Sequence, residues 1–286
     1  RLRVAFGATT RPAFAGLVVV LCVAPAAYAK SSNPAFLGVG MQDRGANGSG
    51  PCVIETVTKD SGAHAAGLRS NDVFVAIDAA PVANCTALIA AIQTHEPGDT
   101  IKIDVTRDTA PMVINAKLHS RADVMRQRVV GQPVPLTSLT RVDNETTSSL
   151  GSKGKTTIVG WFDQRNCVGC ETVFAALQQW ARSKSTKSNQ ITVVGATSGS
   201  PNKSVGENVE DLKGYQRKLD VPLLVADPET FADLAITDAD RIHFMVIDCR
   251  GIVQYAAPLL PDADDKTAVL DELHAAVEQA ARTRGK

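Results

Sequence analysis

The hydrophobic periodicity of the sequence changes near residue 120, and this change limits the chain to folds with two differently built units. The first part has short alternating apolar stretches separated by turn residues, with two short helical patterns. The second part alternates longer apolar runs with amphipathic helical segments. The first pattern is typical of a β-rich domain, and the second is typical of an α/β domain. The sequence therefore predicts a β-rich domain over 33–120, a polar linker over 121–133, and an α/β domain over 134–286.

Residues 1–29 have the features of a secretory signal peptide. Arg1, Arg3 and Arg11 precede an apolar run over 14–24. The small-residue site Ala27-Tyr28-Ala29 follows this run. The alternative is an uncleaved membrane anchor, but the run is shorter than the roughly 20 residues of a spanning helix. We expect cleavage before Lys30, loss of Cys22 with the signal, and a periplasmic or secreted protein of a bacterial envelope without a membrane span.

Charge excludes one class of partner. The 30 basic and 30 acidic residues cancel, and no basic stripe interrupts the sequence. Nucleic-acid binding needs a concentration of positive charge, so we expect no nucleic-acid partner.

Several short motifs of the first part occur together in one known family. The motifs are Phe36-Leu37-Gly38-Val39, Ala66-Gly67-Leu68, Asn71-Asp72-Val73, Pro81-Val82 and Pro97-Gly98-Asp99. As a set they resemble a PDZ domain of the HtrA-protease type, which implies a barrel-like β-sheet with two small helices.

The resemblance also implies a binding site. Amides of Leu37, Gly38 and Val39 would hold the C-terminal carboxylate of a peptide or protein, which would add as an extra strand. Its side chain would enter a pocket formed by Leu88, Ile89 and Ile92. The alternative is a PDZ fold that only packs against its neighbouring domain.

Two cysteines of this domain, Cys52 and Cys85, would lie at the same end of the groove. A disulfide needs their Cα atoms within about 7 Å. We expect two buried free thiols, with a disulfide as the alternative.

The second part resembles the thioredoxin fold, and within it the TlpA-like redoxins of the periplasm. The resemblance rests on "GQPVPLTSL", on the strand–helix material around 211–227, on "VIDCRGIV", and on a Cys-x-x-Cys motif between a strand and a helix. It implies an α/β domain with a central mixed sheet.

The positions of Cys167 and Cys170 predict redox chemistry. A helix N-terminus carries unpaired N–H groups and partial positive charge, which favour thiolate over thiol. We assign Cys167 as the nucleophile and Cys170 as the resolving cysteine, with protein thiols and disulfides as partners and no cofactor. Asp163 and Glu171 could relay a proton, or could be solvated surface groups.

The sequence departs from the redoxin pattern at three places. Asn166 replaces the aromatic residue before the first cysteine, Trp161 stands at the position of the buried acid, and Ile242-His243 stand where a cis-proline is expected. Cys249 follows the far end of that strand, so we expect a free, non-catalytic thiol.

Other functions use the same cysteines. Structural zinc normally needs four ligands, and no second Cys-x-x-Cys or paired histidine lies nearby. A soft metal such as Cu(I) could be held by Cys167, Cys170 and His243, unless His243 faces away and Ile242 faces the pair. A non-catalytic adaptor or scaffold is a further alternative. An exported thiol–disulfide oxidoreductase with a peptide-binding PDZ module is the function that the sequence favours.

Overall fold

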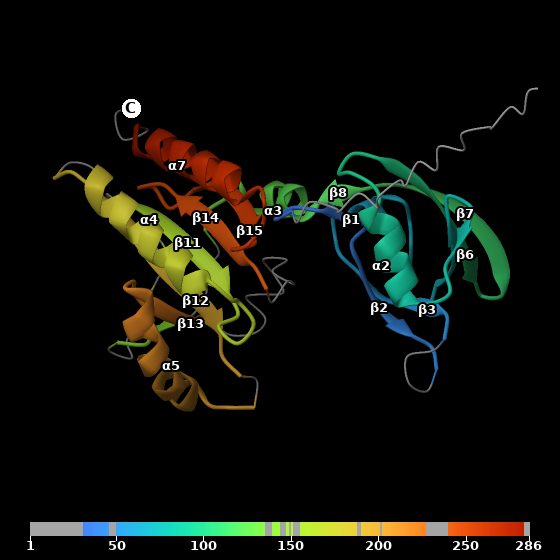
Figure 1. The fold of residues 1–286 in the computed structure, drawn as a ribbon, viewed down its shortest axis with the longest axis horizontal. Helices are drawn as coiled ribbons and strands as arrows, with labels where there is room; N and C mark the ends of the chain where they lie inside the picture. Colours follow the sequence, from blue (N-terminus) through green and yellow to red (C-terminus); the bar gives the residue numbers. More distant parts are fainter. Residues whose placement is uncertain are drawn as a thin grey trace, which may run out of the picture.

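The structure, a computed structural model, describes residues 31–45, 50–134, 139–143, 147–148, 150, 155–187, 190–200, 202–226 and 240–282. These residues form two domains, as predicted, and one helix joins them (Figure 1). The predicted signal peptide lies outside the described residues. None of the helices described is long and apolar enough to cross a membrane.

The first domain is a β-rich unit with two short helices, as the sequence predicts. Its six-stranded sheet has the order β2-β3-β4-β6-β7, with β5 paired to β4, and β1 pairs separately with β8. The strands are β1 (Ala35–Phe36), β2 (Val39–Asp43), β3 (Cys52–Val57), β4 (Val73–Ile77), β5 (Ala80–Pro81), β6 (Thr100–Arg107), β7 (Ala110–Lys117) and β8 (His119–Ser120).

The two helices of this domain begin at side-chain caps. Ser61 caps α1 (Gly62–Ala65) by accepting from the His64 amide. Asn84 caps α2 (Cys85–Gln93) by accepting from the Ala87 amide. These bonds satisfy amides that have no partner inside the helix. The sheet and both helices enclose one apolar core.

Gly38 lies between β1 and β2 and separates them. Its φ is +90°, and a Cβ atom there would collide with the side chain of Ser61. Glycine is the residue that adopts this conformation without steric cost. The break places Leu37 and Gly38 outside both strands, at the start of β2.

The second domain has a central mixed sheet. The strand order is β10-β9-β13-β12-β11-β14-β15, in which β11, β12 and β13 are parallel, β14 is antiparallel to β11, and β15 is antiparallel to β14. The elements are β9 (Leu139–Arg141), β10 (Thr147–Ser148), β11 (Lys155–Phe162), α4 (Cys170–Lys184), β12 (Gln190–Ser198), α5 (Val205–Leu219), β13 (Leu223–Ala226), β14 (Ile242–Ile247), β15 (Val253–Leu259) and α7 (Lys266–Arg282). The elements follow the order βαβ, hairpin and closing helix, and the mixed sheet is the one that the thioredoxin resemblance implies.

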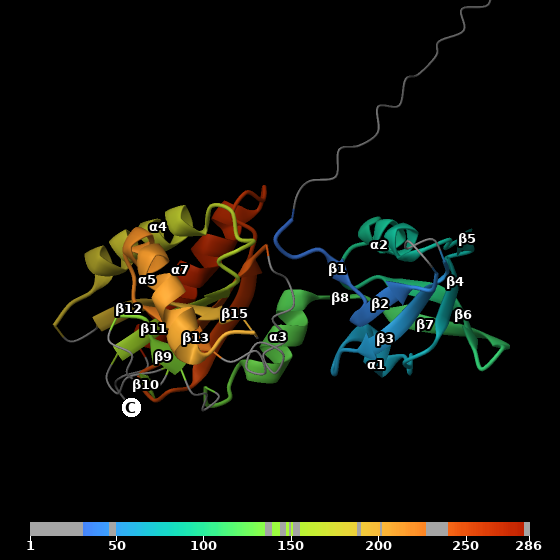
Figure 2. The same cartoon turned by 90° about the horizontal axis from the view of Figure 1, so that it is seen from below.

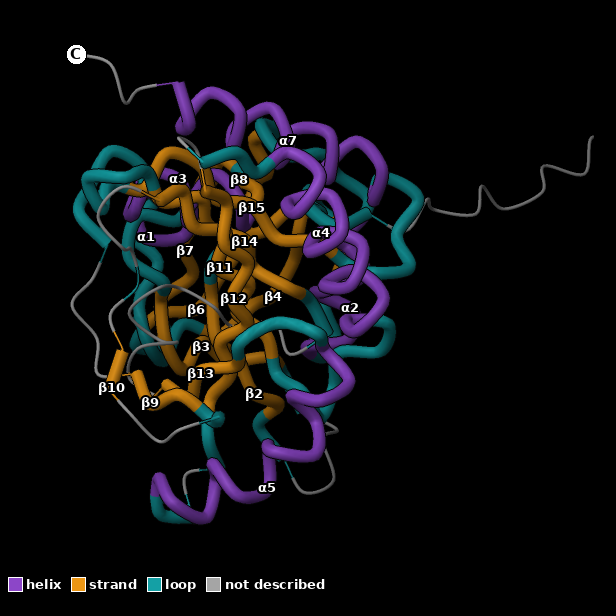
Figure 3. Tube along the Cα trace, turned by 90° about the vertical axis from the view of Figure 1, so that its left-hand side faces the viewer, coloured by secondary structure: helices purple, strands orange, loops and turns teal. Residues whose placement is uncertain are grey.

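Both faces of this sheet are covered, which explains its continuous apolar strands. Helices α4, α5 and α7 cover one face. Figure 3 shows α4 and α7 together on that side of the strands. The opposite face packs against the helix that follows the first domain.

Residues 121–129 of the segment predicted as a polar linker form helix α3 (Arg121–Val129). Ser120 and Asp123 form a capping box at its start. Met125 and Val129 are buried in the core of the second domain, against the sheet. The join is therefore an integral helix, which lies between the two domains in Figure 2.

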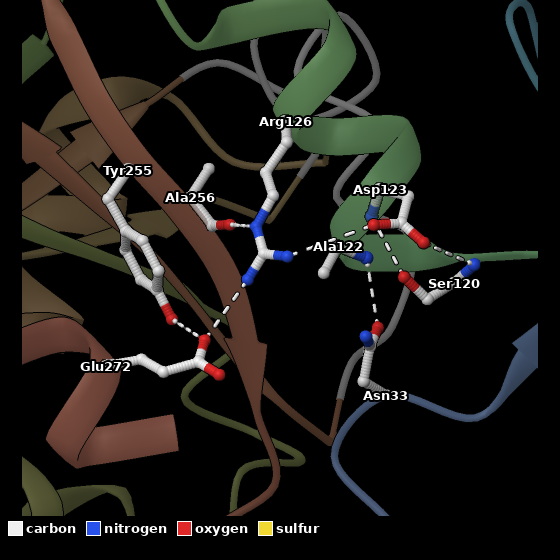
Figure 4. Close-up of polar contacts among 8 residues, drawn as sticks. All are labelled: Asn33, Ser120, Ala122, Asp123, Arg126, Tyr255, Ala256 and Glu272. Carbon is white, nitrogen blue, oxygen red and sulfur yellow. Dashed lines mark hydrogen bonds and ion pairs between the residues drawn. The ribbon is translucent and has the colours of Figure 1, made fainter. Parts of the chain in front are cut away.

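Polar contacts fix α3 on both sides (Figure 4). Asn33 accepts a hydrogen bond from the Ala122 amide at 3.0 Å. Arg126 donates through Nε to the Ala256 carbonyl at 2.9 Å and lies 3.4 Å from Glu272. Its guanidinium also lies 5.4 Å from the centre of the Tyr255 ring. These contacts join the start of the first domain, α3 and β15.

Candidate functional site

Cys167 and Cys170 lie in the connection between β11 and α4 and form a disulfide, with their Cα atoms 5.7 Å apart. The helix begins at Cys170. Gly169 precedes it with φ +85°, so Cys167 belongs to a turn. Cys167 is 6% exposed and Cys170 is fully buried. The cysteine pair thus lies at the positive end of α4, with Cys167 nearer to solvent.

Between the two cysteines, Val168 is 86% exposed. A large apolar side chain with that exposure has no packing role within the chain. It stands beside the disulfide as a contact available to another molecule.

Asp163 organises the turn before Cys167. Its carboxylate accepts from the guanidinium and the backbone amide of Arg165. It also accepts from the side-chain amide of Asn166 at 3.0 Å. Burial alone would raise the pKa of Asp163, but these hydrogen bonds outweigh it and hold the pKa below its ordinary value. Its carbonyl accepts from the Cys167 amide at 3.0 Å. Asp163 is therefore a structural carboxylate and not a ready proton relay, and Asn166 helps to fix the turn.

Glu171, the other acid considered, lies near Tyr215 of α5. Burial and the negative charge of Glu171 raise the pKa of Tyr215 above its ordinary value. Tyr215 in turn packs against Phe162, with ring centres 6.0 Å apart. This contact places Glu171 beside the aromatic packing under the turn at 163–169, which carries Cys167 and is called the redox turn below.

Ile242, and not His243, shares the buried cluster of the two cysteines. His243 is buried and pairs with Trp161 across the sheet. Alternate residues of a strand face opposite sides, so His243 belongs to the α3 face. Within the described residues, Cys167, Cys170 and His243 do not gather as a metal-ligand group.

Cys249 is a free cysteine in the turn after β14. The start of β14 pairs with the cysteine-bearing end of β11, while its end pairs with Thr157 at the other end. This agrees with the predicted location of Cys249 away from the redox turn.

A groove of about 260 Å³ lies between β2 and α2. Beta-strand β2 is at the edge of its sheet, so one side is open to an added strand. The groove is lined by Pro34, Ala35, Phe36, Leu37, Gly38, Val39, Met41, Ile89, Ile92, Gln93, Arg121 and Arg241. The predicted residues Leu37, Gly38, Val39, Ile89 and Ile92 are thus brought together.

Leu88 was predicted in this pocket and is instead fully buried in the domain core. Ile89, one residue further along α2, is 43% exposed and lines the groove. Arg121 and Arg241 were missed, because they lie outside the PDZ motifs and join the groove only through the packing of the two domains.

The expectation of free thiols at Cys52 and Cys85 is wrong, because the two form a disulfide with Cα atoms 4.7 Å apart. Asp43 brings them together. It pairs with Cys52 across β2 and β3, and its carboxylate accepts from the Cys85 amide at 2.6 Å. Within the described part of the chain, Asp43, Cys52 and Cys85 are the one group whose side chains lie close enough together to hold a metal ion. The sulfurs of Cys52 and Cys85 are bonded to each other, so they are not thiolate ligands in this structure.

Comparison with known proteins assigns the first domain. Residues 35–118 match the family model of the PDZ domain. No curated protein matches the chain. Among solved structures, the HtrA-type protease AlgW with a decapeptide is similar at 22% identity and a TM-score of 0.28, over 31% of this chain and 30% of that protease. The similarity thus spans less than a third of the protease.

Two other solved structures are similar over about half of this chain. A proposed electron transfer protein from Aquifex aeolicus VF5 has 17% identity and a TM-score of 0.40, over 55% of this chain and 96% of that one. A proposed protein disulfide isomerase from Bacteroides thetaiotaomicron has 17% identity and a TM-score of 0.38, over 52% and 90%. Residues 35–118 thus match the PDZ domain, and the strand order and helix placement of the domain that follows are those of a thioredoxin type of fold.

Proposed function

We propose that the protein is an exported thiol–disulfide oxidoreductase that captures protein partners through its PDZ groove. The observation that carries the redox part is the Cys167–Cys170 disulfide at the start of α4, beside the exposed Val168. A structural disulfide closing so small a loop would restrict the unfolded chain little. A helix N-terminus instead favours the thiolate that exchange requires.

The reaction is a two-step exchange. In the reduced protein, the Cys167 thiolate attacks one sulfur of a partner disulfide, a mixed disulfide forms, and the other partner sulfur leaves as a thiolate. Cys170 then loses its proton and attacks the sulfur of Cys167, which releases the second partner thiolate and re-forms the Cys167–Cys170 bond. Two electrons pass to the partner, and the reverse sequence oxidises a partner dithiol.

Catalysed reduction of insulin by dithiothreitol tests this activity. Wild-type protein should accelerate the reaction, and Cys167→Ser should remove the acceleration because the attacking sulfur is lost. Cys249→Ser is the matched control, since it removes a thiol outside the site. No acceleration by correctly folded wild-type protein would favour the adaptor function instead.

The PDZ groove supports the second part of the proposal. Edge strand β2, the open turn at Leu37 and Gly38, and the apolar walls at Ile89 and Ile92 fit a peptide that adds as a strand. Fluorescence anisotropy with labelled peptides that end in an apolar residue tests it. A bulky Gly38→Trp variant, at a position where even a Cβ atom collides with Ser61, should lose binding. The matched control is Gly131→Trp, where a Cβ atom would meet no neighbour.

The signal-peptide features of residues 1–29 support export to the bacterial envelope. An oxidising compartment is also where a disulfide such as Cys52–Cys85 persists. The N-terminal sequence of protein recovered from the periplasm tests this, with Lys30 expected as the first residue. An N-terminus that retains the apolar run would contradict it.

A further inference from the structure

Three elements of the first domain meet at one point, and each contributes a residue of a type that binds metal ions. Asp43 is the last residue of β2, Cys52 is the first residue of β3, and Cys85 is the first residue of α2. A carboxylate oxygen of Asp43 and the two sulfurs lie within 4.8 Å of one another. These three side chains are called the Asp-Cys-Cys cluster below.

The carboxylate of Asp43 is already oriented by the backbone. Its Oδ1 accepts from the Cys85 amide at 2.6 Å, while Asn84 separately caps the same helix through the Ala87 amide. Carboxylates that ligate metal ions are themselves hydrogen-bonded, and this bond fixes the direction of the ligating oxygen. The second oxygen, Oδ2, therefore remains for an ion beside the two sulfurs.

Reduction of the Cys52–Cys85 bond turns the cluster into a set of ligands. The disulfide takes up two electrons and two protons from a dithiol, which itself becomes a disulfide, and two thiols result. If both thiols ionised, they and the carboxylate would place three negative charges together, and Cys52 is fully buried. Burial and neighbouring like charges disfavour ionisation, so the thiols stay protonated until a cation binds.

We propose that the reduced Asp-Cys-Cys cluster is a binding site for Zn²⁺. This ion accepts two thiolates, a carboxylate and one water in a tetrahedral arrangement, and its binding releases the two thiol protons. The sulfurs then lie about 3.8 Å apart, a separation that rotation about the Cα–Cβ bonds supplies once the S–S bond is broken. Ca²⁺ and Mg²⁺ prefer oxygen ligands alone, whereas Zn²⁺ accepts sulfur and oxygen together.

The cluster reaches the surface of the domain. Asp43 and Cys85 are only partly buried, so a water molecule can complete the coordination from that side. The ion would join the end of β2, the start of β3 and the start of α2, two of which the disulfide joins in the oxidised chain. The cluster thus provides two alternative cross-links, a covalent bond and an ion, which are selected by the redox state. The zinc site is independent of peptide binding and of the activity of Cys167.

Titration with Co²⁺ tests the zinc site, because Co²⁺ replaces Zn²⁺ in tetrahedral thiolate sites and absorbs visible light there. The full chain carries Cys167→Ser and Cys170→Ser throughout, so that this pair cannot bind metal, and it is reduced with a phosphine. One equivalent of Co²⁺ should produce thiolate-to-cobalt charge-transfer bands and tetrahedral d–d bands. One equivalent of Zn²⁺ should then remove them.

Variants separate the cluster from metal binding by thiols alone. Asp43→Asn keeps an oxygen for the Cys85 amide but removes the anionic ligand, so it should weaken Co²⁺ and Zn²⁺ binding at least tenfold. Cys52→Ser and Cys85→Ser should each abolish stoichiometric binding. Glu55→Gln removes an exposed carboxylate from the same strand as Cys52, and as the matched control it should bind like the parent chain. Circular dichroism shows whether each reduced variant is folded.

The reduction potential of Cys52–Cys85 gives a second measurement, on the wild-type chain. An ion that binds only the dithiol form raises this potential by about 30 mV for each tenfold increase of free Zn²⁺ above the dissociation constant. In chelator-buffered Zn²⁺ the wild-type chain should show this slope. The total rise from zinc-free buffer should be at least about 30 mV smaller in Asp43→Asn, the equivalent of a tenfold weaker site.

Three results would overturn the zinc site. They are the absence of an equimolar Co²⁺ complex in the reduced chain, equal metal affinity of Asp43→Asn and the parent chain, and a Cys52–Cys85 potential that does not move with Zn²⁺. The second result would also be obtained if an unfolded chain bound the metal through its two thiols, because Asp43 would then lie outside the complex.

Discussion

Arg241 and Ile242 are consecutive residues that belong to two different sites. Arg241 lines the groove of the PDZ domain, whereas Ile242 is buried in the cluster that contains Cys167 and Cys170. Strand β14 starts at Ile242, where the redoxin resemblance implies a cis-proline. The start of β14 is therefore also the place where the second domain reaches the peptide groove. A partner in the groove and a partner at the redox turn would meet the same short segment.

The order of attack follows from the difference in exposure between the two cysteines. Cys170→Ser should accumulate mixed disulfides with partner proteins, because Cys167 can attack while no resolving thiol follows. Cys167→Ser should accumulate none, because Cys170 is fully buried. Non-reducing gels followed by mass spectrometry measure the adducts, with Cys249→Ser as control. Equal trapping by both single variants would contradict the assignment.

Val168 is expected to contact protein substrates. Val168→Ser should lower kcat/KM for insulin reduction by about threefold to tenfold, because burial of a valine side chain contributes roughly 1.5 kcal/mol at most in a partial contact. The effect should be on KM. Reduction of a small disulfide such as oxidised glutathione should change little. An equal loss with both substrates would show that Val168 acts on the cysteines themselves.

The Cys52–Cys85 disulfide is expected to stabilise the PDZ domain. The bond spans a sequence separation of 33, for which the loss of unfolded-state entropy corresponds to about 3–4 kcal/mol. The double variant Cys52→Ala/Cys85→Ala should lower the free energy of unfolding by about that amount in urea titrations. Cys249→Ala is the matched control. A change below about 1 kcal/mol would contradict a stabilising role.

Asp72 should make the stability of the PDZ domain depend on acid pH. Burial alone would raise the pKa of Asp72, but hydrogen bonds from Arg107 and from the Arg69 amide outweigh it and lower the pKa. The folded pKa is below the unfolded value of about 3.9. The stabilisation is therefore present above about pH 4 and is lost as the pH falls through the folded pKa.

The variant Asp72→Asn tests this dependence. It should cost about 2 kcal/mol at pH 7, the typical contribution of hydrogen bonds to a charged group. The cost should shrink toward pH 2, as measured by urea unfolding of the full chain between pH 2 and pH 7. Glu55→Gln, at an exposed position of β3, is the control. A cost that does not vary with pH would contradict the assignment.

Local signals predicted most of the fold. The Cys-x-x-Cys motif was expected between a strand and a helix, and the PDZ motifs indicated a β-rich domain; both features depend on residues close in sequence. The break between β1 and β2 at Gly38 was not indicated, because glycine is compatible with more than one backbone conformation.

The errors arose where distant residues decide the outcome. Asp43 joins Cys52 and Cys85 through tertiary contacts that their spacing does not reveal. The segment 121–133 has many charged residues, yet α3 buries Met125 and Val129 against a sheet formed much later in the chain. Arg241 joins the groove only because two domains pack together, so no motif could have identified it.

The reduction potential of the Cys167–Cys170 pair decides whether this disulfide exchanges with partner proteins or is structural. The chain can be equilibrated in glutathione and dithiothreitol buffers, alkylated and analysed by mass spectrometry, with Cys52–Cys85 as a second disulfide in the same molecule. We expect Cys167–Cys170 to titrate as a two-electron couple between roughly −270 and −120 mV, the range of thioredoxin-fold catalysts, while Cys52–Cys85 stays oxidised throughout that range. A Cys167–Cys170 potential below about −300 mV, as in structural disulfides, would contradict a redox-active site.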